Sequence, residues 1–382
     1  MRKICVVIGS RANYSSIKSL LSAVQEHESL QLQTVVAASA LLDRYGAVVD
    51  LIEADGFKPD AKVHMLIEGE TPATMAKSTG LGLIELPSVF ERLAPDIVIT
   101  VGDRFETMAT TLAAAYMNIC VAHTMGGEVS GTIDESIRHA VTKFAHIHFP
   151  ASGQAKERIL RLGESPETVH LVGCPRIDLV AEILKQDSKV GSELFKQGVG
   201  DEFDMDEPFL LVSQHPVTTE YGDGEEQITK TLSAISSMNL PCFVLWPNAD
   251  AGSEDISRGI RKWRESGLAQ KMYFLKNLSV ETYVRLMKQT ACLVGNSSSG
   301  IREGAFVGTP VVNIGSRQND RQHAANVIHA DHDVEEIKLA ITRHLNNGHY
   351  APDSVYGDGN AGKRIAEILS SVPFLIQKRI AY

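Results

Sequence analysis

The chain has 382 residues, of which 43% are hydrophobic and 22% are charged, an ordinary globular composition for which two domains are the better expectation. Its formal net charge is -10 at pH 7 and it has no run of Lys and Arg, which argues against nucleic acid or an anionic membrane as a partner. No stretch approaches the roughly 20 apolar residues that a membrane-spanning helix needs, and the apolar run at the N-terminus is too short for a signal peptide.

The first half alternates short β-branched runs with longer amphipathic segments, the first helix starting at about Ser15. Strands are expected over residues 3–9, 31–39, 96–103, 118–124, 146–152 and 168–174. The second half repeats the pattern, with strands expected over residues 208–216, 242–248, 271–276, 292–299, 309–316 and 326–330. Helices are expected over residues 279–289 and 333–346. Continuous apolar strands alternating with helices predict parallel sheets that helices cover on both faces.

The two halves are joined by a polar segment. Lys185 to Pro208 is acidic and poor in strand-forming residues, so it is the predicted linker, with a domain boundary near residue 190. In open parallel sheets ligands bind at the carboxyl ends of the strands, so the polar residues after each apolar run are the candidates for chemistry.

Two such candidates follow strands of the first half. Arg11 and Lys18 come after the first strand, where they are expected to bind a phosphate rather than to lie on a solvated face. Asp103 and Arg104 follow the strand that ends at Val101. A carboxylate there can be oriented by the next helix N-terminus and by Arg104, although a simple N-cap is the alternative.

The richest segment is His123 to His139, which combines glycines, the carboxylates Glu128 and Asp134, and the basic pair Arg138 and His139. An i,i+4 ion pair between Asp134 and Arg138 explains part of the pattern. It does not explain the Gly-Gly-Glu loop that ends at Glu128, so a catalytic loop is predicted.

Metal and redox chemistry have little support. Five scattered cysteines without CxxC spacing predict neither a disulfide framework nor a metal site, and they favour a reducing, cytoplasmic compartment. His146 and His148 alternate on a predicted strand without other ligands nearby, which favours structural histidines. No cofactor is therefore expected.

In the second half, His215 follows a strand and is a candidate for proton transfer or for holding a pyrophosphate oxygen. Ser297 and Ser298 lie in a Gly-Asn-Ser-Ser-Ser-Gly run that leads into a helix, where hydroxyls and backbone N–H groups favour a phosphate. Glu303 follows at a spacing that suits the two hydroxyls of a ribose.

Arg317 and Arg321 follow the next strand and would complete an anion site with forked hydrogen bonds. By contrast, the run from Gly357 to Lys363 imitates a phosphate loop but is followed by Arg364 where a Ser or Thr is required. It is expected to be a loop before the last helix.

Together these motifs resemble the hydrolysing UDP-N-acetylglucosamine 2-epimerases, including those of sialic acid biosynthesis, over nearly the whole chain. The motifs, in chain order, are GSRANYS, GDRFE, HTMGGEVSGTIDESIRHA, QHPVTTE, WPNADAGS, VGNSSSGIREG and GSRQNDR. A sister group acting on UDP-2,4-diacetamido-2,4,6-trideoxyglucose, on the way to legionaminic acid, shares them.

The resemblance implies two Rossmann-like domains of glycosyltransferase-B type with a UDP-sugar in the interdomain cleft, and a homodimer or homotetramer. The domains would be residues 1–190, rejoined by a helix at about 363–382, and residues 191–362. It assigns Asp103 and Asp134 to catalysis, with His215 and Glu128 as further candidates. The substrate or UDP contacts implied or suspected are Arg11, Lys18, Arg104, Arg138, His139, Ser297, Ser298, Glu303, Arg317 and Arg321.

Three departures from the family pattern concern the first domain. Met125 replaces a catalytic Glu, Ala40 lies in a loop that usually holds a His, and Asn13 replaces an Asp or Glu. The leading hypothesis is hydrolytic 2-epimerisation of a UDP-2-acetamido sugar. The alternatives are the same reaction on the diacetamido sugar, a lyase that stops at the glycal, a glycosyltransferase, and an inactive UDP-sugar binder.

Overall fold

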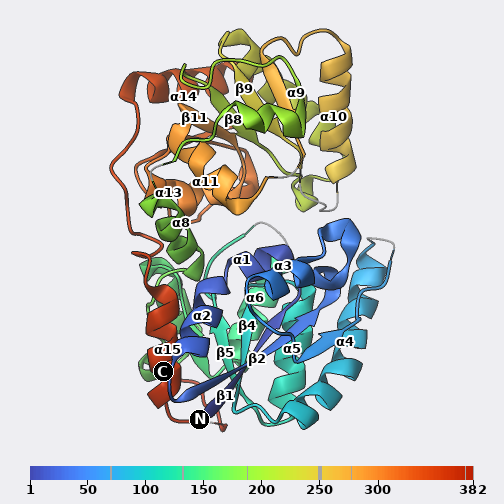
Figure 1. The fold of residues 1–382 in the computed structure, drawn as a ribbon, viewed down its shortest axis with the longest axis vertical. Helices are drawn as coiled ribbons and strands as arrows, with labels where there is room; N and C mark the ends of the chain where they lie inside the picture. The colour runs from blue at the N-terminus through green and yellow to red at the C-terminus, as the bar shows by residue number, and fades with distance from the viewer. Residues whose placement is uncertain are drawn as a thin grey trace. The chain divides into compact units, whose positions relative to one another are not determined.

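The computed structural model describes residues 1–68, 71–130, 133–186, 188–247, 252–276, 278–374 and 376–381, and divides into two compact units. Unit 1 comprises Met1–Glu128, Ile133–Leu179 and Tyr356–Tyr382, and most of unit 2 is Val180–Val355. Each unit is a parallel-sheet α/β domain, as the strand pattern predicted (Figure 1). The division falls between Leu179 and Val180, about ten residues before the expected boundary.

The sheet of unit 1 has six parallel strands. Their order is β3 (Ala61–Val63), β2 (Leu30–Ala37), β1 (Arg2–Ile8), β4 (Ile97–Val101), β5 (Cys120–Thr124) and β6 (Ile147–Phe149). Every residue of β4 and β5 is buried, which explains why these strands read as unbroken apolar runs. Residues 168–174 were expected to form a strand but contribute only an isolated bridge, between Val169 and His148.

Helices cover both faces of this sheet. The helices of unit 1 are α1 (Arg11–Ser15), α2 (Lys18–Glu26), α3 (Val48–Ala54), α4 (Pro72–Leu93), α5 (Phe105–Tyr116), α6 (Ile133–Phe144), α7 (Gly153–Arg161), α15 (Ala361–Ser371) and α8 (Pro175–Lys185), which runs into unit 2. One core cluster joins the sheet to α2, α3 and α15, and another joins it to α4 and α5. Across the described parts of the chain, the helices lack the length and apolar character that crossing a bilayer requires.

The sheet of unit 2 has seven strands, six of them parallel. Their order is β13 (Val327–Ala330), β12 (Val311–Ile314), β11 (Cys292–Gly295), β8 (Leu210–Ser213), β9 (Cys242–Leu245), β10 (Met272–Leu275) and β7 (Gly198–Gly200). The helices are α9 (Gly224–Ser237), α10 (Ser253–Glu265), α11 (Val280–Gln289), α12 (Ser298–Ile301), α13 (Glu303–Val307) and α14 (Val334–Asn347). The core lies between the sheet and α9, α10 and α14.

The predicted linker is wrong as a linker, because much of it packs into unit 2. Its residues 198–200 form β7, which runs antiparallel along the edge of β10. Phe195 is buried and its ring contacts Phe203, Phe243 and Tyr273 with centroids 4.8–5.7 Å apart. Burial of these rings stabilises unit 2 and holds the segment in place. Phe195 and Phe203 were the aromatic clue in this otherwise polar segment that it packs into a core.

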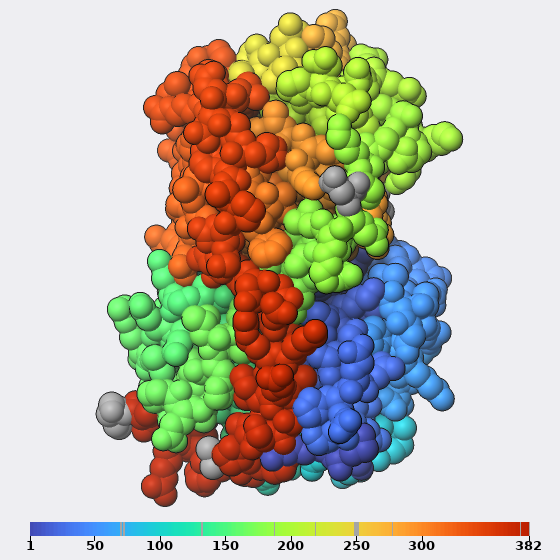
Figure 2. All heavy atoms as spheres, turned by 60° about the vertical axis from the view of Figure 1, so that its left-hand side comes forward, coloured from blue at the N-terminus to red at the C-terminus, as the bar shows by residue number. Residues whose placement is uncertain are grey.

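The last helix begins within the sequence that imitates a phosphate loop. The Asp178 carboxylate accepts hydrogen bonds from the backbone N–H groups of Ala361 (2.9 Å) and Gly362 (2.7 Å), so a side chain already fills the position that a phosphate would take. A Cβ on Gly362 would lie 2.7 Å from the backbone of Ser19, so the glycine allows α15 to pack closely against α2. The helix ends at Ser371 rather than near residue 382. Figure 2 shows this C-terminal segment, in red, running over the surface beside the blue N-terminal residues.

Asp178→Ala is expected to lower the free energy of unfolding by about 1–2 kcal/mol, because it removes the acceptor for two helix N-terminal N–H groups. The Ser19 hydroxyl, 2.9 Å from Asp178, loses a partner as well. Chemical denaturation measures the loss. Asp50→Ala, on the exposed face of α3, is the control and should shift the value by less than about 0.5 kcal/mol. Equal values for the two variants would contradict the capping role.

Candidate active site

The candidate residues of unit 1 gather at the carboxyl ends of its central strands. Asp103 lies two residues after β4, Arg104 is the N-cap of α5, and Arg11 begins α1 after β1. Glu128 follows β5, and Asp134 lies in the first turn of α6. Because parallel strands place all their carboxyl ends at one edge, residues far apart in the sequence meet there, as the strand pattern predicted.

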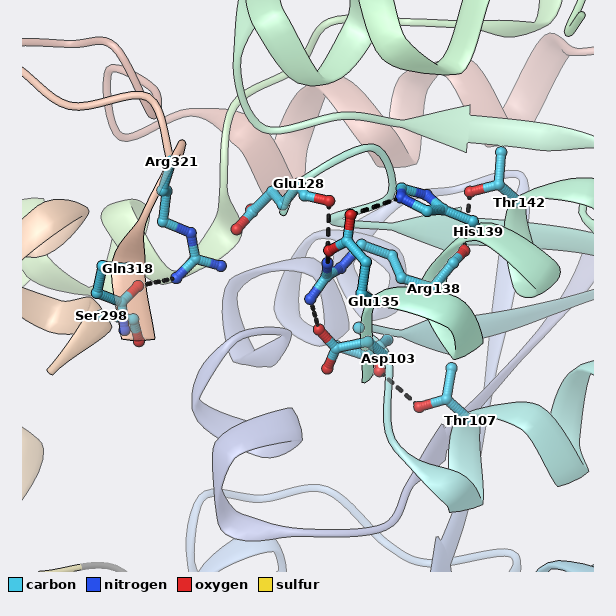
Figure 3. A network of polar contacts seen from close by, with 12 residues as sticks. Asp103, Thr107, Glu128, Glu135, Arg138, His139, Thr142, Ser298, Gln318 and Arg321 are labelled. Carbon is cyan, nitrogen blue, oxygen red and sulfur yellow. Dashed lines mark hydrogen bonds and ion pairs between the residues drawn. The ribbon is translucent and has the colours of Figure 1, made fainter. Parts of the chain in front are cut away.

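Arg138 is the centre of this cluster. Its guanidinium, only 2% exposed, donates to Asp103 and to Glu135 Oε2 (2.9 Å), and its Nη1 also donates to the backbone oxygen of Glu128 (2.9 Å) (Figure 3). His139 Nε2 lies 2.8 Å from the other oxygen of Glu135. The bonds of Arg138 to Asp103 and to Glu128 were not foreseen from the sequence, and they tie three segments of unit 1 to one cation.

Burial by itself would lower the pKa of Arg138, but the charges of Asp103, Glu128 and Glu135 outweigh it and raise the pKa. The guanidinium therefore stays charged, and it attracts the carboxylates that surround it. A carboxylate held in this way can accept a proton, and the cation fixes its orientation.

Asn13 has a structural task that explains its departure from the family pattern. Its Oδ1 accepts from the backbone N–H of Gly9 (3.1 Å) and its Nδ2 donates to the backbone oxygen of Val101 (3.3 Å). The side chain thus joins the ends of β1 and β4. An ionised Asp or Glu could not donate the second hydrogen bond, so the amide suits this position better than a carboxylate.

Glu106, in the first turn of α5, is a buried carboxyl that was not a candidate from the sequence. Its side chain is 4% exposed and lies 3.4 Å from Arg104 Nε. A Cβ at Gly9 would lie 2.3 Å from its Cγ, so Glu106 packs directly against the loop after β1. Burial raises the pKa of Glu106, opposed by Arg104. Its position in the sequence GDRFE was the available signal, but burial cannot be read from a motif.

The loop between β5 and α6 is shaped by Gly127. Its φ is +74°, and a Cβ there would lie 2.2 Å from the backbone oxygen of Ala155. Only glycine allows this approach. The next residue, Glu128, is buried at the edge of the cluster. Gly131 and Thr132, from the same motif, lie outside the described residues.

Two departures from the family pattern are accounted for by packing. Met125 has a φ of +62° and its side chain packs against the apolar core of unit 1. Ala40 is fully buried, and its N–H donates to the backbone oxygen of Gly9 (3.1 Å). Neither side chain can transfer a proton.

Lys18 and the strand histidines have structural partners. Lys18 Nζ lies 2.7 Å from Asp55 at the end of α3. His148 is buried with its Nε2 3.1 Å from Glu164, and His146 Nδ1 accepts from the backbone N–H of Val121. The structural interpretation of His146 and His148 is confirmed.

In unit 2 the candidates gather at the ends of β8 and β11. Asn296 Oδ1 accepts a hydrogen bond from the backbone N–H of His215 (2.7 Å), and Asn296 Nδ2 donates to the backbone oxygen of His215 (2.8 Å). A Cβ at Gly295 would lie 2.1 Å from the Ser213 oxygen, so only glycine lets the two strand ends approach this closely. Asn296, which sequence analysis passed over, fixes His215 beside the serine loop.

Cationic side chains surround the serine loop, defined as Ser297 to Ser299. Arg317 and Gln318 donate to the backbone oxygen of Asn296 at 3.2 and 2.9 Å, and Arg321 donates to Gln318 Oε1 at 2.8 Å (Figure 3). Arg302, not selected from the sequence, donates to Ser298 Oγ at 3.2 Å, and its neighbour Glu303 is buried. The serine loop and these guanidinium groups together favour an anion. Residues 248–251 of the motif WPNADAGS lie outside the described residues.

His215 is unsuited to act as a cation. Burial, assisted by Arg317, lowers its pKa to about 3, so the imidazole is neutral at pH 7 and can accept or donate a hydrogen bond without carrying charge. In unit 1, burial likewise lowers the pKa of His123 to about 3. His123 Nε2 lies 2.7 Å from the backbone oxygen of Gly102, so this histidine is part of the frame.

These two histidines predict acid sensitivity. Between pH 6.5 and about 3 the unfolded chain binds protons at both positions while the folded chain does not, so the free energy of unfolding falls as the pH drops through this window. Denaturation at a series of pH values measures the slope. His123→Asn should make the dependence shallower, because it removes one of the two groups. An identical slope for wild type and His123→Asn would contradict the prediction.

Two parallel-sheet α/β units, one with a carboxylate cluster and one with the serine loop, define a two-domain fold of the glycosyltransferase-B type. The sequence profile of the UDP-N-acetylglucosamine 2-epimerase family matches residues 22–370. The chain therefore belongs to this family, whose members are enzymes.

Relatives match over nearly the full length of the chain. The UDP-N,N'-diacetylbacillosamine 2-epimerase (hydrolyzing) of Legionella pneumophila is 34% identical, covering 98% of this chain and 97% of its own. The UDP-N-acetylglucosamine 2-epimerase of Neisseria meningitidis is 28% identical, covering 97% and 96%. A crystal structure of the Neisseria meningitidis UDP-GlcNAc 2-epimerase bound to UDP-GlcNAc has a TM-score of 0.80 at 17% identity, covering 96% of this chain and 99% of that one, and supports the fold.

Proposed function

We propose that the protein catalyses hydrolytic 2-epimerisation of a UDP-2-acetamido sugar, with UDP-GlcNAc and water giving ManNAc and UDP. The observation that carries the proposal is the binding of the buried cation Arg138 to the carboxylates of Asp103 and Glu135 and to the backbone oxygen of Glu128, in a chain of the epimerase family. Carboxylates fixed in this way can accept and return protons, which is the work that inversion at a carbon requires.

The chemistry follows from the substrate. No ring carbon next to C2 is a carbonyl that could stabilise a carbanion at C2. Loss of the C2 proton must therefore accompany cleavage of the bond from C1 to UDP. The electron pair of the C2–H bond becomes the double bond of 2-acetamidoglucal, and UDP leaves with the C1–O pair. A proton then adds to C2 from the opposite face while water adds its oxygen to C1. The product is a free sugar inverted at C2.

We assign the proton transfers to Asp103 and Asp134, with Glu128 as the further carboxylate, and binding of UDP to unit 2. Arg11, Arg104, Arg138 and His139 would contact the sugar or the diphosphate from unit 1. In unit 2 the anionic leaving group would be stabilised by Ser297, Ser298, His215, Arg317 and Arg321, and Glu303 would accept the ribose hydroxyls. Five buried free cysteines agree with work in the cytoplasm, where we expect a homodimer or homotetramer.

A second sugar is favoured by a separate observation. The Legionella pneumophila relative, 34% identical, is a UDP-N,N'-diacetylbacillosamine 2-epimerase, and that sugar is a UDP-2,4-diacetamido-2,4,6-trideoxyglucose. It presents the same C1 and C2 to the enzyme, so the same residues would perform the same reaction. The two sugars differ at C4 and C6, and they should therefore be compared directly.

Proton NMR of the protein with each sugar in deuterated water tests the proposal. UDP together with a 2-epimerised free sugar, deuterated at C2, is the expected result for the true substrate. A persistent vinyl signal of the glycal would instead identify a lyase. Unchanged spectra for both sugars at high enzyme concentration would refute the proposal.

A further inference from the structure

Tyr283 of α11 is hydrogen-bonded to the serine loop of unit 2. Its hydroxyl lies 2.6 Å from Ser299 Oγ, which lies 2.7 Å from Ser297 Oγ. The backbone N–H of Ser299 also donates to Ser297 Oγ, at 3.4 Å. A chain of hydroxyl groups thus connects α11 to the first residue of the loop.

Tyr283, where the chain of hydroxyl groups begins, is held in place by its helix. Tyr283 lies one turn into α11, whose N-cap Ser279 accepts a hydrogen bond from the N–H of Thr282. Neighbouring Val284, Leu286 and Met287 are buried. Burial raises the pKa of Tyr283, so its hydroxyl keeps its proton at neutral pH and can donate it.

The direction of the hydrogen bonds then follows. When Tyr283 donates to Ser299 Oγ, the Ser299 hydroxyl can donate to Ser297 Oγ. Ser297 Oγ then receives two donors from Ser299, and its own proton points to an outside acceptor. Serine hydroxyls rotate freely, so this order depends on the group at the far end of the chain. Hydrogen bonds in such a chain also strengthen one another.

We propose that Tyr283 is a positioning residue that orders the serine loop, so that Ser297 presents its O–H to an oxygen of the UDP group. The inference rests on the proposed function, because it takes UDP as the ligand of unit 2. Tyr283 itself does not touch the ligand. Its effect appears as affinity for UDP, which the loop binds before and after the reaction.

Calorimetric titration of the full-length protein with UDP alone tests the inference. Tyr283→Phe keeps the ring and removes the hydroxyl, and it should weaken UDP binding about five- to tenfold, the worth of one neutral hydrogen bond. Ser299→Ala cuts the same chain and should weaken binding by a similar factor. The double variant should be little weaker than either single variant, because both interrupt one chain. In turnover, kcat/KM should fall by the same factor as the affinity.

Tyr350→Phe is the matched control. It makes the same chemical change in unit 2, where the Tyr350 hydroxyl lies 3.2 Å from His344 Nδ1, outside the serine loop. UDP affinity should be unchanged in this variant even if its unfolding midpoint shifts.

Three outcomes decide the matter. If Tyr283→Phe and Ser299→Ala bind UDP within twofold of wild type, the positioning role is wrong. It is also wrong if Tyr350→Phe loses affinity to the same extent, because a general loss of stability would then explain the effect. If wild type does not bind UDP, the proposed function is wrong. Unchanged affinity in the variants, by contrast, contradicts only the positioning role. Should Tyr283→Phe not fold, Ser299→Ala still tests the chain.

Discussion

Asp103→Asn is expected to lower kcat about 100- to 10,000-fold, the usual cost of removing a proton-transfer group. The amide oxygen can still accept a hydrogen bond from Arg138, so the cluster should keep its geometry while losing one proton acceptor. Release of UDP from the preferred sugar measures the rate. Exchange of the C2 proton in deuterated water measures the proton transfer directly, and it should slow by a similar factor.

A matched variant separates this effect from a change of net charge. Asp50→Asn alters the charge by the same amount on the exposed face of α3, and its kcat should remain within about twofold of wild type, as for a surface change that touches no reacting group. If Asp103→Asn turned over at the wild-type rate, Asp103 would not be a proton-transfer residue. Asp134 and Glu128 would then be the carboxylates to examine.

The architecture was largely predictable because its signal is local. Strands such as β4 and β5 are buried on both faces and read as continuous apolar runs, so their positions and parallel arrangement follow from the pattern. β3 and β7 are three residues long and lack that signal. β7 forms because two glycines let the backbone approach β10, where a Cβ at Gly198 would lie 2.2 Å from the Phe274 oxygen. That is a tertiary contact, which local propensity does not record.

The positions of the candidate site residues could be predicted, but not which of their side chains contact one another. Polar residues directly after strands can be selected from the sequence because parallel strands end at one edge. Which of them pair depends on side-chain direction: Arg138 reaches Asp103, 35 residues away, as well as Glu135 one turn away. Asn296 and Tyr283 act through residues already selected, and nothing in their spacing marks them.

The family departures illustrate the same limit. Comparison of motifs marks Met125 as the loss of a catalytic group, and the structure adds that the partly buried side chain packs against the core of unit 1. Asn13 replaces the Asp or Glu of the family pattern, and its amide makes a pair of hydrogen bonds that a carboxylate could not make. A departure in a motif therefore has to be judged by the contacts of the new side chain.

Arg138→Met is expected to lower the free energy of unfolding by about 3–5 kcal/mol, the range for removing one partner from a buried ion pair. Met fills a similar volume, so the loss reflects charge and hydrogen bonding rather than a cavity. The carboxylates of Asp103 and Glu135 and the backbone oxygen of Glu128 would each lose a donor. Activity should fall with stability, because Asp103 would no longer be oriented. Chemical denaturation of the full-length protein measures the effect.

Two further variants test whether the buried charge is the cause. Arg44→Met removes an arginine from an exposed ion pair with Glu68 in the same unit and should cost less than about 1 kcal/mol. Asp103→Asn in the Arg138→Met background removes a carboxylate left without its cation, so the double variant should be more stable than Arg138→Met alone. If adding Asp103→Asn lowered stability further, the carboxylate would be stabilised by other groups, and Arg138 would not be the centre of the cluster.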